Sequence, residues 1–241
     1  MMILGLDTAT RATVAAVRSS TGEVAVERRD DPAAQSKPRH TTMLLSLTVQ
    51  ALARAGVGWA EIDRIAVGVG PGTFTGLRIG IATARALARA RSVPLVGVST
   101  LESLALGAAE AAEAATTRKS VIAVIDARRG EVFAAGWAVG RGGRLAEQIL
   151  LPGAVAPETF ARTLAKRPAA LVVGDGAVKF RAILERSGAS IPEDESKLHE
   201  VSGLCHCRLA LSVPAGSPEL VRPEYLRLPD ADIALRTAGK R

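Results

Sequence analysis

Two stretches of this sequence repeat one pattern: ILGLDTATRATVAAV at residues 3–17 and IAVIDARRGEVFAAG at residues 122–136. Each aligns without a gap as an apolar run ending in aspartate, a polar turn and a second apolar run. Self-similarity of this kind is typical of a duplicated unit, although a single hairpin pattern can also recur by chance. The repeat therefore predicts two similar lobes with a cleft between them, and it places Asp7 and Asp126 at matching strand ends.

The rest of the chain extends this pattern into two α/β lobes with mixed β-sheets flanked by helices. In the first lobe, hydrophobic periodicity predicts the order β-β-β-α-β-α-β of a ribonuclease-H-like unit, at 2–6, 13–17, 24–28, 41–55, 65–69, 76–91 and 95–98. In the second, helices follow the repeat at 157–165, 176–186 and 201–213, with a strand at 171–173 and a linking helix at 101–115. We expect lobes at 1–104 and 105–225 and a tail at 226–241.

Composition narrows the class of protein. No apolar run approaches the roughly 20 residues of a membrane span, and two cysteines among 241 residues suit a reducing compartment, so we expect a cytoplasmic protein with no membrane contact. The net charge of +7 favours an acidic partner such as RNA. Aromatic residues make up only 3%, which argues against a base-stacking platform. Any RNA contact is expected through phosphates and arginine.

The glycine-rich stretch GVGPGTFTGLRIG, residues 68–80, resembles a phosphate-binding loop before a helix. No lysine follows it as a Walker loop requires, and the third glycine is misplaced for a dinucleotide-binding loop. Exposed backbone N–H groups at a helix start can still bind an anion. The sequence favours a structural turn over an anion site here.

The helix after this loop carries small residues every four positions, at Gly76, Gly80, Ala84 and Ala88. Such a ridge lets another backbone approach closely. It packs either on the chain's own sheet or, together with the preceding helix, on a partner protein, and the residues alone leave both interpretations open.

The remaining candidate sites are less specific. Strand-end aspartates such as Asp7 and Asp126 hold Mg-phosphate in two-lobed phosphotransferases, but they also cap turns. Cys205, His206 and Cys207, with His199 nearby, look like a metal cluster, yet three successive helical residues point in different directions, so we predict no metal site. His40 is expected at the surface or in a helix cap, and no Ser-His-Asp arrangement is predicted.

Five stretches together carry a family resemblance: ILGLDTAT (3–10), GPGTFTGLRIG (70–80), VPLVGVSTLESLA (93–105), IDARRGEVF (125–133) and PEYLR (223–227). They run in order over nearly the whole chain, and in this respect the sequence resembles the bacterial tRNA threonylcarbamoyladenosine biosynthesis family TsaB, also called YeaZ. The resemblance implies the actin-like ATPase fold. It also implies a role in placing a threonylcarbamoyl group on N6 of the adenosine next to the anticodon of tRNA.

In that family the catalytic subunit is a paralogue, TsaD, whose His-Met-Glu-Gly-His stretch binds the metal. The matching stretch here is Thr100-Leu101-Glu102-Ser103-Leu104, which lacks both histidines. The resemblance thus implies a non-catalytic subunit that binds TsaD, with the ATPase TsaE joining and tRNA contacted indirectly. No catalytic residue, metal or cofactor is expected in this chain. ATP or ADP is expected only within the complex.

The family pairs its subunits through two helices of the first lobe, as a four-helix bundle, and the same surface implies homodimers when the partner is missing. Carried onto this chain, the expected partner interface comprises Leu44, Leu45, Thr48, Leu52, Leu77, Gly80, Ile81, Ala84, Arg85 and Ala88. The expected remnant of a nucleotide cleft comprises Asp7, Thr8, Gly72, Asp126 and Arg128. On this assignment, Ala84→Arg abolishes pairing and leaves the fold intact.

Two alternative functions remain at the level of sequence. One is an ATP-dependent phosphotransferase of the same fold that uses Asp7 and Asp126. The other is a glycoprotein-type peptidase, which the sequence disfavours because it offers no zinc-binding histidine pair and no credible nucleophile.

Overall fold

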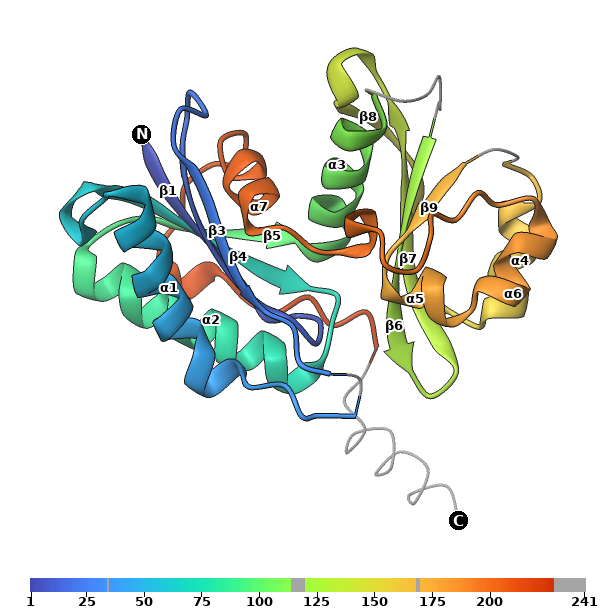
Figure 1. The fold of residues 1–241 in the computed structure, drawn as a ribbon, viewed down its shortest axis with the longest axis horizontal. Helices are drawn as coiled ribbons and strands as arrows, with labels where there is room; N and C mark the ends of the chain where they lie inside the picture. Colours follow the sequence, from blue (N-terminus) through green and yellow to red (C-terminus); the bar gives the residue numbers. More distant parts are fainter. Residues whose placement is uncertain (34, 114–119, 168–169, 228–241) are drawn as a thin grey trace.

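The computed structural model describes residues 1–33, 35–113, 120–167 and 170–227, and these form two lobes, each built on a mixed β-sheet (Figure 1). In the described residues, the first sheet has the strand order β3-β2-β1-β4-β5 and the second the order β8-β7-β6-β9. The predicted fold class, two duplicated lobes with mixed sheets flanked by helices, is confirmed. No helix among the described residues is long and apolar enough to cross a membrane.

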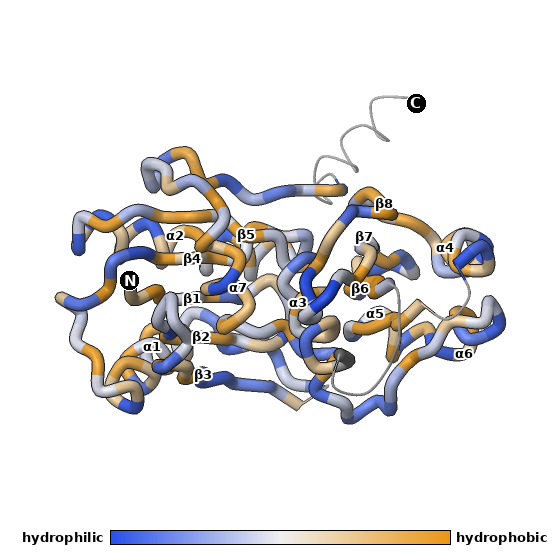
Figure 2. Tube along the Cα trace, turned by 90° about the horizontal axis from the view of Figure 1, so that it is seen from above, coloured by the Kyte–Doolittle hydropathy of each residue, from blue (hydrophilic) through white to orange (hydrophobic). Residues whose placement is uncertain are grey.

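The first sheet follows the predicted order closely. Its strands are β1 (Met2–Asp7), β2 (Thr13–Ser19), β3 (Ala25–Asp30), β4 (Ile62–Gly70) and β5 (Leu95–Ser99). Strand β1 lies in the centre, antiparallel to β2 and parallel to β4. Helices α1 (His40–Ala55) and α2 (Phe74–Arg91) cover one face of this sheet (Figure 1). The edge strand β3 is polar over most of its length (Figure 2), which suits an exposed sheet edge.

The second sheet repeats the centre of the first. Its strands are β6 (Ser120–Arg128), β7 (Glu131–Val139), β8 (Leu145–Val155) and β9 (Leu171–Val173). Strand β6 is antiparallel to β7 and parallel to β9, as β1 is to β2 and β4. The register differs by one residue, because Asp7 pairs with Val14, whereas Asp126 pairs with Val132 and not with Phe133, the aligned counterpart of Val14. Strand β8 was not predicted, because its apolar residues do not alternate and it contains proline, which sheets tolerate at an edge.

The other helices depart from the predictions at their ends. They are α3 (Thr100–Glu113), α4 (Pro157–Leu164), α5 (Asp175–Lys179), α6 (Arg181–Leu184) and α7 (Gly203–Leu209). Short 3-10 turns are η1 (Trp59–Glu61), η2 (Arg141–Gly143), η3 (Glu185–Ser187), η4 (Lys197–His199) and η5 (Pro218–Leu220). The helix predicted at 176–186 is interrupted at Phe180. The end of the linking helix, 114–115, and most of the predicted tail, 228–241, lie outside the described residues.

Helix α7 is the main difference from the predicted domain boundaries. It packs on β1 and β2 of the first sheet, on the face opposite α1 and α2 (Figure 1). The contact is close: a Cβ on Gly5 would lie 2.3 Å from the carbonyl oxygen of Gly203. Residues of the predicted second lobe, 105–225, therefore return to the first lobe, and the predicted boundary at 104 falls inside α3.

After α7, residues 216–227 run along the first lobe, and we name this segment the C-terminal strap. It bridges to the edge strand β5 through Gly216 and Leu95, and the Glu224 N–H donates to the Val69 carbonyl oxygen at 2.8 Å. At its end, the Arg227 guanidinium donates to the Ala127 carbonyl oxygen at 3.2 Å. The strap thus links the first lobe to the β6–β7 hairpin of the second.

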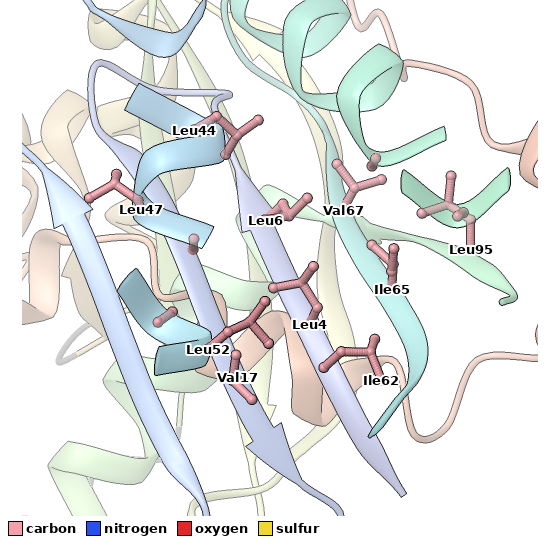
Figure 3. Packing of buried hydrophobic residues seen from close by; sticks show 14 of the residues in the cluster. Leu4, Leu6, Val17, Leu44, Leu47, Leu52, Ile62, Ile65, Val67 and Leu95 are labelled. Atoms are coloured by element: carbon pink, nitrogen blue, oxygen red, sulfur yellow. The ribbon is translucent and has the colours of Figure 1, made fainter. Parts of the chain in front are cut away.

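The core of the first lobe lies between its sheet and helices α1 and α2 (Figure 3). Aliphatic side chains of both layers interdigitate there, among them Leu4, Leu6, Val17, Leu44, Leu47, Leu52, Ile65 and Val67. Burial of this apolar surface, at about 25 cal/mol per Å², is the main favourable contribution to the stability of the lobe. The inner faces of α1 and α2 are thereby committed to their own sheet.

Candidate functional site

Asp7, at the end of β1, lies in a closed polar network inside the first lobe. Its carboxylate accepts the Ala9 N–H at 2.9 Å, and its Oδ2 atom lies 3.0 Å from His206 Nε2 on α7. The side chains of Asp7 and His206 are 1% and 0% exposed. Burial alone would lower the pKa of His206, but the contact with Asp7 and its negative charge outweigh burial and raise that pKa. Asp7 therefore has an internal basic partner, and its charge favours the protonated form of that histidine.

Ser103 extends this network into a Ser-His-Asp series that the sequence did not predict. The Ser103 hydroxyl lies 2.7 Å from His206 Nδ1 and also donates to the Ser202 carbonyl oxygen at 3.0 Å. The series resembles a hydrolytic triad in order, but all three side chains are buried in the lobe. Because a nucleophile has to reach its substrate, this arrangement fits a structural role and gives the peptidase alternative no support.

The glycine-rich loop closes over the turn that follows Asp7. The Thr73 N–H donates to the Ala9 carbonyl oxygen at 2.7 Å, and the Thr8 hydroxyl donates to the Gly76 carbonyl oxygen at 2.7 Å. A Cβ on Gly76 would lie 2.0 Å from the Thr8 carbonyl oxygen, and a Cβ on Gly72 would lie 2.4 Å from that of Ala9. The glycines thus permit close packing of the loop. Thr8 and Gly72 make their contacts with other residues of the same chain.

Asp126, the counterpart of Asp7 in the second lobe, is paired by exposed cations instead. Its two carboxylate oxygens lie 3.0 and 2.9 Å from Lys179 Nζ, and Arg128 lies 3.2 Å from one of them. The Asp126 N–H donates to Asp175 at 3.0 Å, and burial raises the pKa of that second carboxyl group. Lys179 is a site residue that the sequence did not reveal, because it lies 53 positions away from its partner.

A small cleft of about 180 Å³ lies between the lobes. Its lining comes from the β1–β2 turn, β3, α3, β6, α5 and the segment before α7, and includes Arg11, Arg29, Leu104, Ile125, Asp175 and Val201. Pockets that enclose drug-sized ligands are typically about 300–1,000 Å³. The fold family implies Mg-nucleotide between the lobes, but the described residues do not fit it, since the cleft is small, neither Asp7 nor Asp126 lines it, and both aspartates are already paired.

The histidines and cysteines do not converge on one point. His40 is buried rather than at the surface, with Nδ1 2.9 Å from the Thr13 hydroxyl, and burial lowers its pKa. His199 Nδ1 accepts the Gly174 N–H at 3.0 Å. Burial raises the pKa of Cys205 to about 12, so this thiol is inert near neutral pH. Among the described residues, no group of three His, Cys, Asp or Glu side chains is placed to hold a metal ion.

Most of the predicted partner interface lies in the chain's own core. Eight of its residues are buried against the first sheet: Leu44, Thr48, Leu52, Leu77, Gly80, Ile81, Ala84 and Ala88. Arg85 is half-buried because its guanidinium donates to the strap carbonyl oxygens of Pro218, at 3.1 Å, and Val221. These positions have to be corrected: the small-residue ridge packs on the chain's own first lobe, where a Cβ on Gly80 would lie 2.3 Å from the Thr8 hydroxyl oxygen.

The outward faces of the same two helices are open. On α1, Leu45 and Val49 are 50% and 55% exposed, one turn apart. On α2, the exposed residues Ala82 and Ala86 are likewise one turn apart. Exposed apolar side chains gathered on one face of a protein can mark an interaction surface. We define the α1–α2 outer face by Leu45, Val49, Ala82 and Ala86. It is the candidate interaction surface, and it lies on a different face of the two helices from the one that the sequence analysis selected.

The two sheets and their paired strand-end aspartates define a two-lobed protein of the actin-like ATPase fold. A family model described as "TsaD: tRNA N6-adenosine threonylcarbamoyltransferase" matches residues 32–162, more than half of the chain, and the chain belongs to this family. Within it, the chain is TsaB/YeaZ-like: it is similar to a Pseudomonas aeruginosa protein solved as one "with similarity to peptidase YEAZ". That similarity has 30% identity and a TM-score of 0.75, and covers 94% of this chain and 99% of the other.

Sequence relatives agree with this placement. The tRNA threonylcarbamoyladenosine biosynthesis protein TsaB of Escherichia coli is 40% identical over 133 residues, 55% of this chain and 53% of the relative. The tRNA N6-adenosine threonylcarbamoyltransferase of Paramagnetospirillum magneticum is 34% identical over 117 residues, 44% of this chain and 34% of the relative. The match to the Escherichia coli relative thus spans about half of that protein's length.

Proposed function

We propose that this chain is the non-catalytic scaffold subunit of the complex that transfers a threonylcarbamoyl group to N6 of adenosine in tRNA. In this role it binds and supports a catalytic paralogue, TsaD, and the ATPase TsaE joins the assembly. The relatives named for tRNA threonylcarbamoyladenosine biosynthesis support the pathway. The observation that carries the scaffold role is the exposed α1–α2 outer face in a chain whose Asp7 and Asp126 are already paired internally.

The pairing partner is argued from the similarity itself. A threonylcarbamoyltransferase relative shares 34% identity with this chain over 117 residues, so a protein of that kind carries a comparable α/β lobe. Two similar lobes pack well when the same surface of each meets around a local two-fold axis. Helices α1 and α2 of this chain and the equivalent pair of the partner then form a four-helix bundle. A second copy of this chain competes for the same face.

The test is an arginine placed on the outer face. Ala84→Arg, suggested by the sequence, is unsuitable because Ala84 is buried and a charge there would prevent folding. Ala86→Arg instead puts the cation on the exposed side of α2. We expect it to lower the affinity for the paralogue by about a hundredfold, since a charge buried in an interface without a partner costs several kcal/mol.

Co-purification and isothermal titration with the paralogue measure this change. Ala182→Arg on α6 is the matched control, because Ala182 is an exposed helical alanine of the other lobe. Wild-type affinity of Ala86→Arg, with the fold intact by circular dichroism, would show that the α1–α2 outer face is not the pairing surface.

A further inference from the structure

Where the strap leaves the first lobe, two of the sequence stretches that carry the family resemblance meet. Tyr225 of the strap stacks on Phe74 at the start of α2, with ring centroids 5.0 Å apart and a 30° tilt. The Arg78 guanidinium lies 3.7 Å from the centre of the Phe74 ring, and its Nε donates to the Tyr225 hydroxyl at 3.3 Å. Stacking and hydrogen bonding thus hold three planar groups in one place before any ligand arrives.

This cluster reaches the surface. Phe133, Trp137 and Phe160 are buried in the second lobe and Trp59 and Phe180 are partly buried, whereas Tyr225, the one tyrosine of the sequence, is 39% exposed. Arg78 is exposed as well. An aromatic ring kept at the surface by an arginine adds little to the core, so its placement indicates contact with something outside the chain.

Two further arginines lie at the next contact of the strap, the β6–β7 hairpin. The strap reaches this hairpin through Arg227, which contacts the Ala127 carbonyl oxygen and Glu131 (Figure 1). Arg128 and Arg129 adopt left-handed backbone angles, with φ of 64° and 52°, although this region costs a residue with a side chain about 1–2 kcal/mol. Strain of this kind is concentrated at functional sites.

The hairpin also carries several cations. Arg128 and Lys179 both bind the carboxylate of Asp126, with the Asp175 carboxyl group behind it, and Arg227 pairs with Glu131 at 3.0 Å. Arg227 joins this group to the strap two residues after Tyr225, on a chain whose net charge is +7. Positive charge beside exposed planar groups is the combination by which proteins bind unpaired bases and their phosphates.

We propose that Phe74, Arg78, Tyr225, Arg128 and Arg129 form a surface on which this chain itself contacts the single-stranded part of the tRNA. An unpaired base stacks on Tyr225 and Arg78, and the hairpin arginines bind the phosphates beside it. The inference rests on the proposed function for the identity of the RNA. It replaces the sequence-based expectation of indirect contact with direct contact by a small stacking site.

The test is fluorescence anisotropy with a labelled tRNA transcript, using the full chain alone and in its complex with the paralogue. Tyr225→Ala should weaken binding at least about fivefold, because base stacking on an aromatic ring contributes roughly 1–3 kcal/mol. Arg129→Gln should reduce the slope of the logarithm of the binding constant against the logarithm of salt concentration by about one. Arg186→Gln, an exposed arginine just after α6 on the far side of the second lobe, is the charge-matched control and should change the slope less.

Two outcomes overturn the inference. One is wild-type tRNA affinity and salt slope for both variants, each folded by circular dichroism. The other is unchanged tRNA binding with lost binding of the paralogue, which would make the cluster a protein-binding site. If tRNA modification in a reconstituted reaction needs this chain but Tyr225→Ala binds tRNA normally, only this inference fails. If modification proceeds without the chain, the proposed function fails.

Discussion

Asp7 ends β1 and Asp126 lies two residues before the end of the matching strand β6, and the chain surrounds the two aspartates differently. Asp7 is sealed in the first lobe, between the glycine-rich loop and His206 of α7, with both members of the pair buried. Asp126 sits at the rim of the second lobe, held by Lys179 and Arg128, which are 45% and 50% exposed. The two lobes therefore share the topology of their central strands, but their turns differ, since five residues separate β1 from β2 and two separate β6 from β7. Each lobe also pairs its aspartate with different side chains.

The comparison also explains why the cleft is a weak candidate for nucleotide chemistry. A phosphate-binding metal needs carboxylates whose oxygens are available to it. Both aspartates instead have basic partners from within the chain, and the Thr8 hydroxyl donates to the Gly76 carbonyl oxygen of the glycine-rich stretch. The surfaces that remain open are outside the cleft, on the α1–α2 outer face and at the end of the strap.

Replacing the basic partner of each aspartate should give the largest difference in unfolding free energy between the two lobes. His206→Ala leaves the Asp7 charge buried without a partner, which typically costs about 3–5 kcal/mol of unfolding free energy. Lys179→Met at the matching pair should cost no more than about 1 kcal/mol, because Lys179 is solvent-exposed and Arg128 remains. Urea denaturation of both variants measures the difference. Equal losses would mean that the two pairs are equally buried in solution.

The pH dependence of stability tests the same comparison, with a smaller expected change in unfolding free energy. The folded-state pKa of His206 is raised because Asp7 and, further away, Glu27 favour the protonated ring despite burial. A raised histidine pKa stabilises the fold below the unfolded value of about 6.5, and the effect is lost as pH rises through the folded value. The stability gap between wild type and His206→Gln should therefore shrink above about pH 6.5, by up to about 1.4 kcal/mol per pH unit.

The stability difference between wild type and His206→Gln is the quantity to measure, because the titration of His40 changes stability with the opposite sign. Burial lowers the pKa of His40, so its contribution is lost as pH falls below the unfolded value. It is present in both proteins and cancels in their difference. Denaturation curves at about pH 6 and about pH 9 suffice, and a gap that widened with pH would contradict a protonated His206.

Much of the fold was predictable because the repeat and the hydrophobic periodicity are local. The pairing of Asp7 with Val14 and of Asp126 with Val132 follows from two hairpins that are each contiguous in sequence. Strand β8 was missed since its apolar residues do not alternate. The packing of α7 on the first sheet was missed because it joins residues about 200 positions apart, such as Cys207 and Ile3.

The candidate sites were predicted less well for the same reason. The sequence placed Asp7 correctly at a strand end, whereas the strand of Asp126 continues to Arg128. Their partners His206 and Lys179 are distant in the chain. It also located the two helices of the candidate partner surface, yet chose the face with the small residues. Small residues at four-residue spacing permit close packing without indicating on what, and here Gly76 and Gly80 pack on Thr8 of the same chain.

The central claim is that this chain acts through its outer surface and not through chemistry at Asp7 and Asp126. The most direct measurement is the rate of tRNA threonylcarbamoylation in a reconstituted reaction containing wild type, Ala86→Arg or Asp126→Asn. Asp126→Asn removes the carboxylate charge of the second lobe's aspartate and should support modification at close to the wild-type rate, whereas Ala86→Arg should abolish it. Loss of modification with Asp126→Asn, while its complex with the paralogue still forms, would contradict the claim.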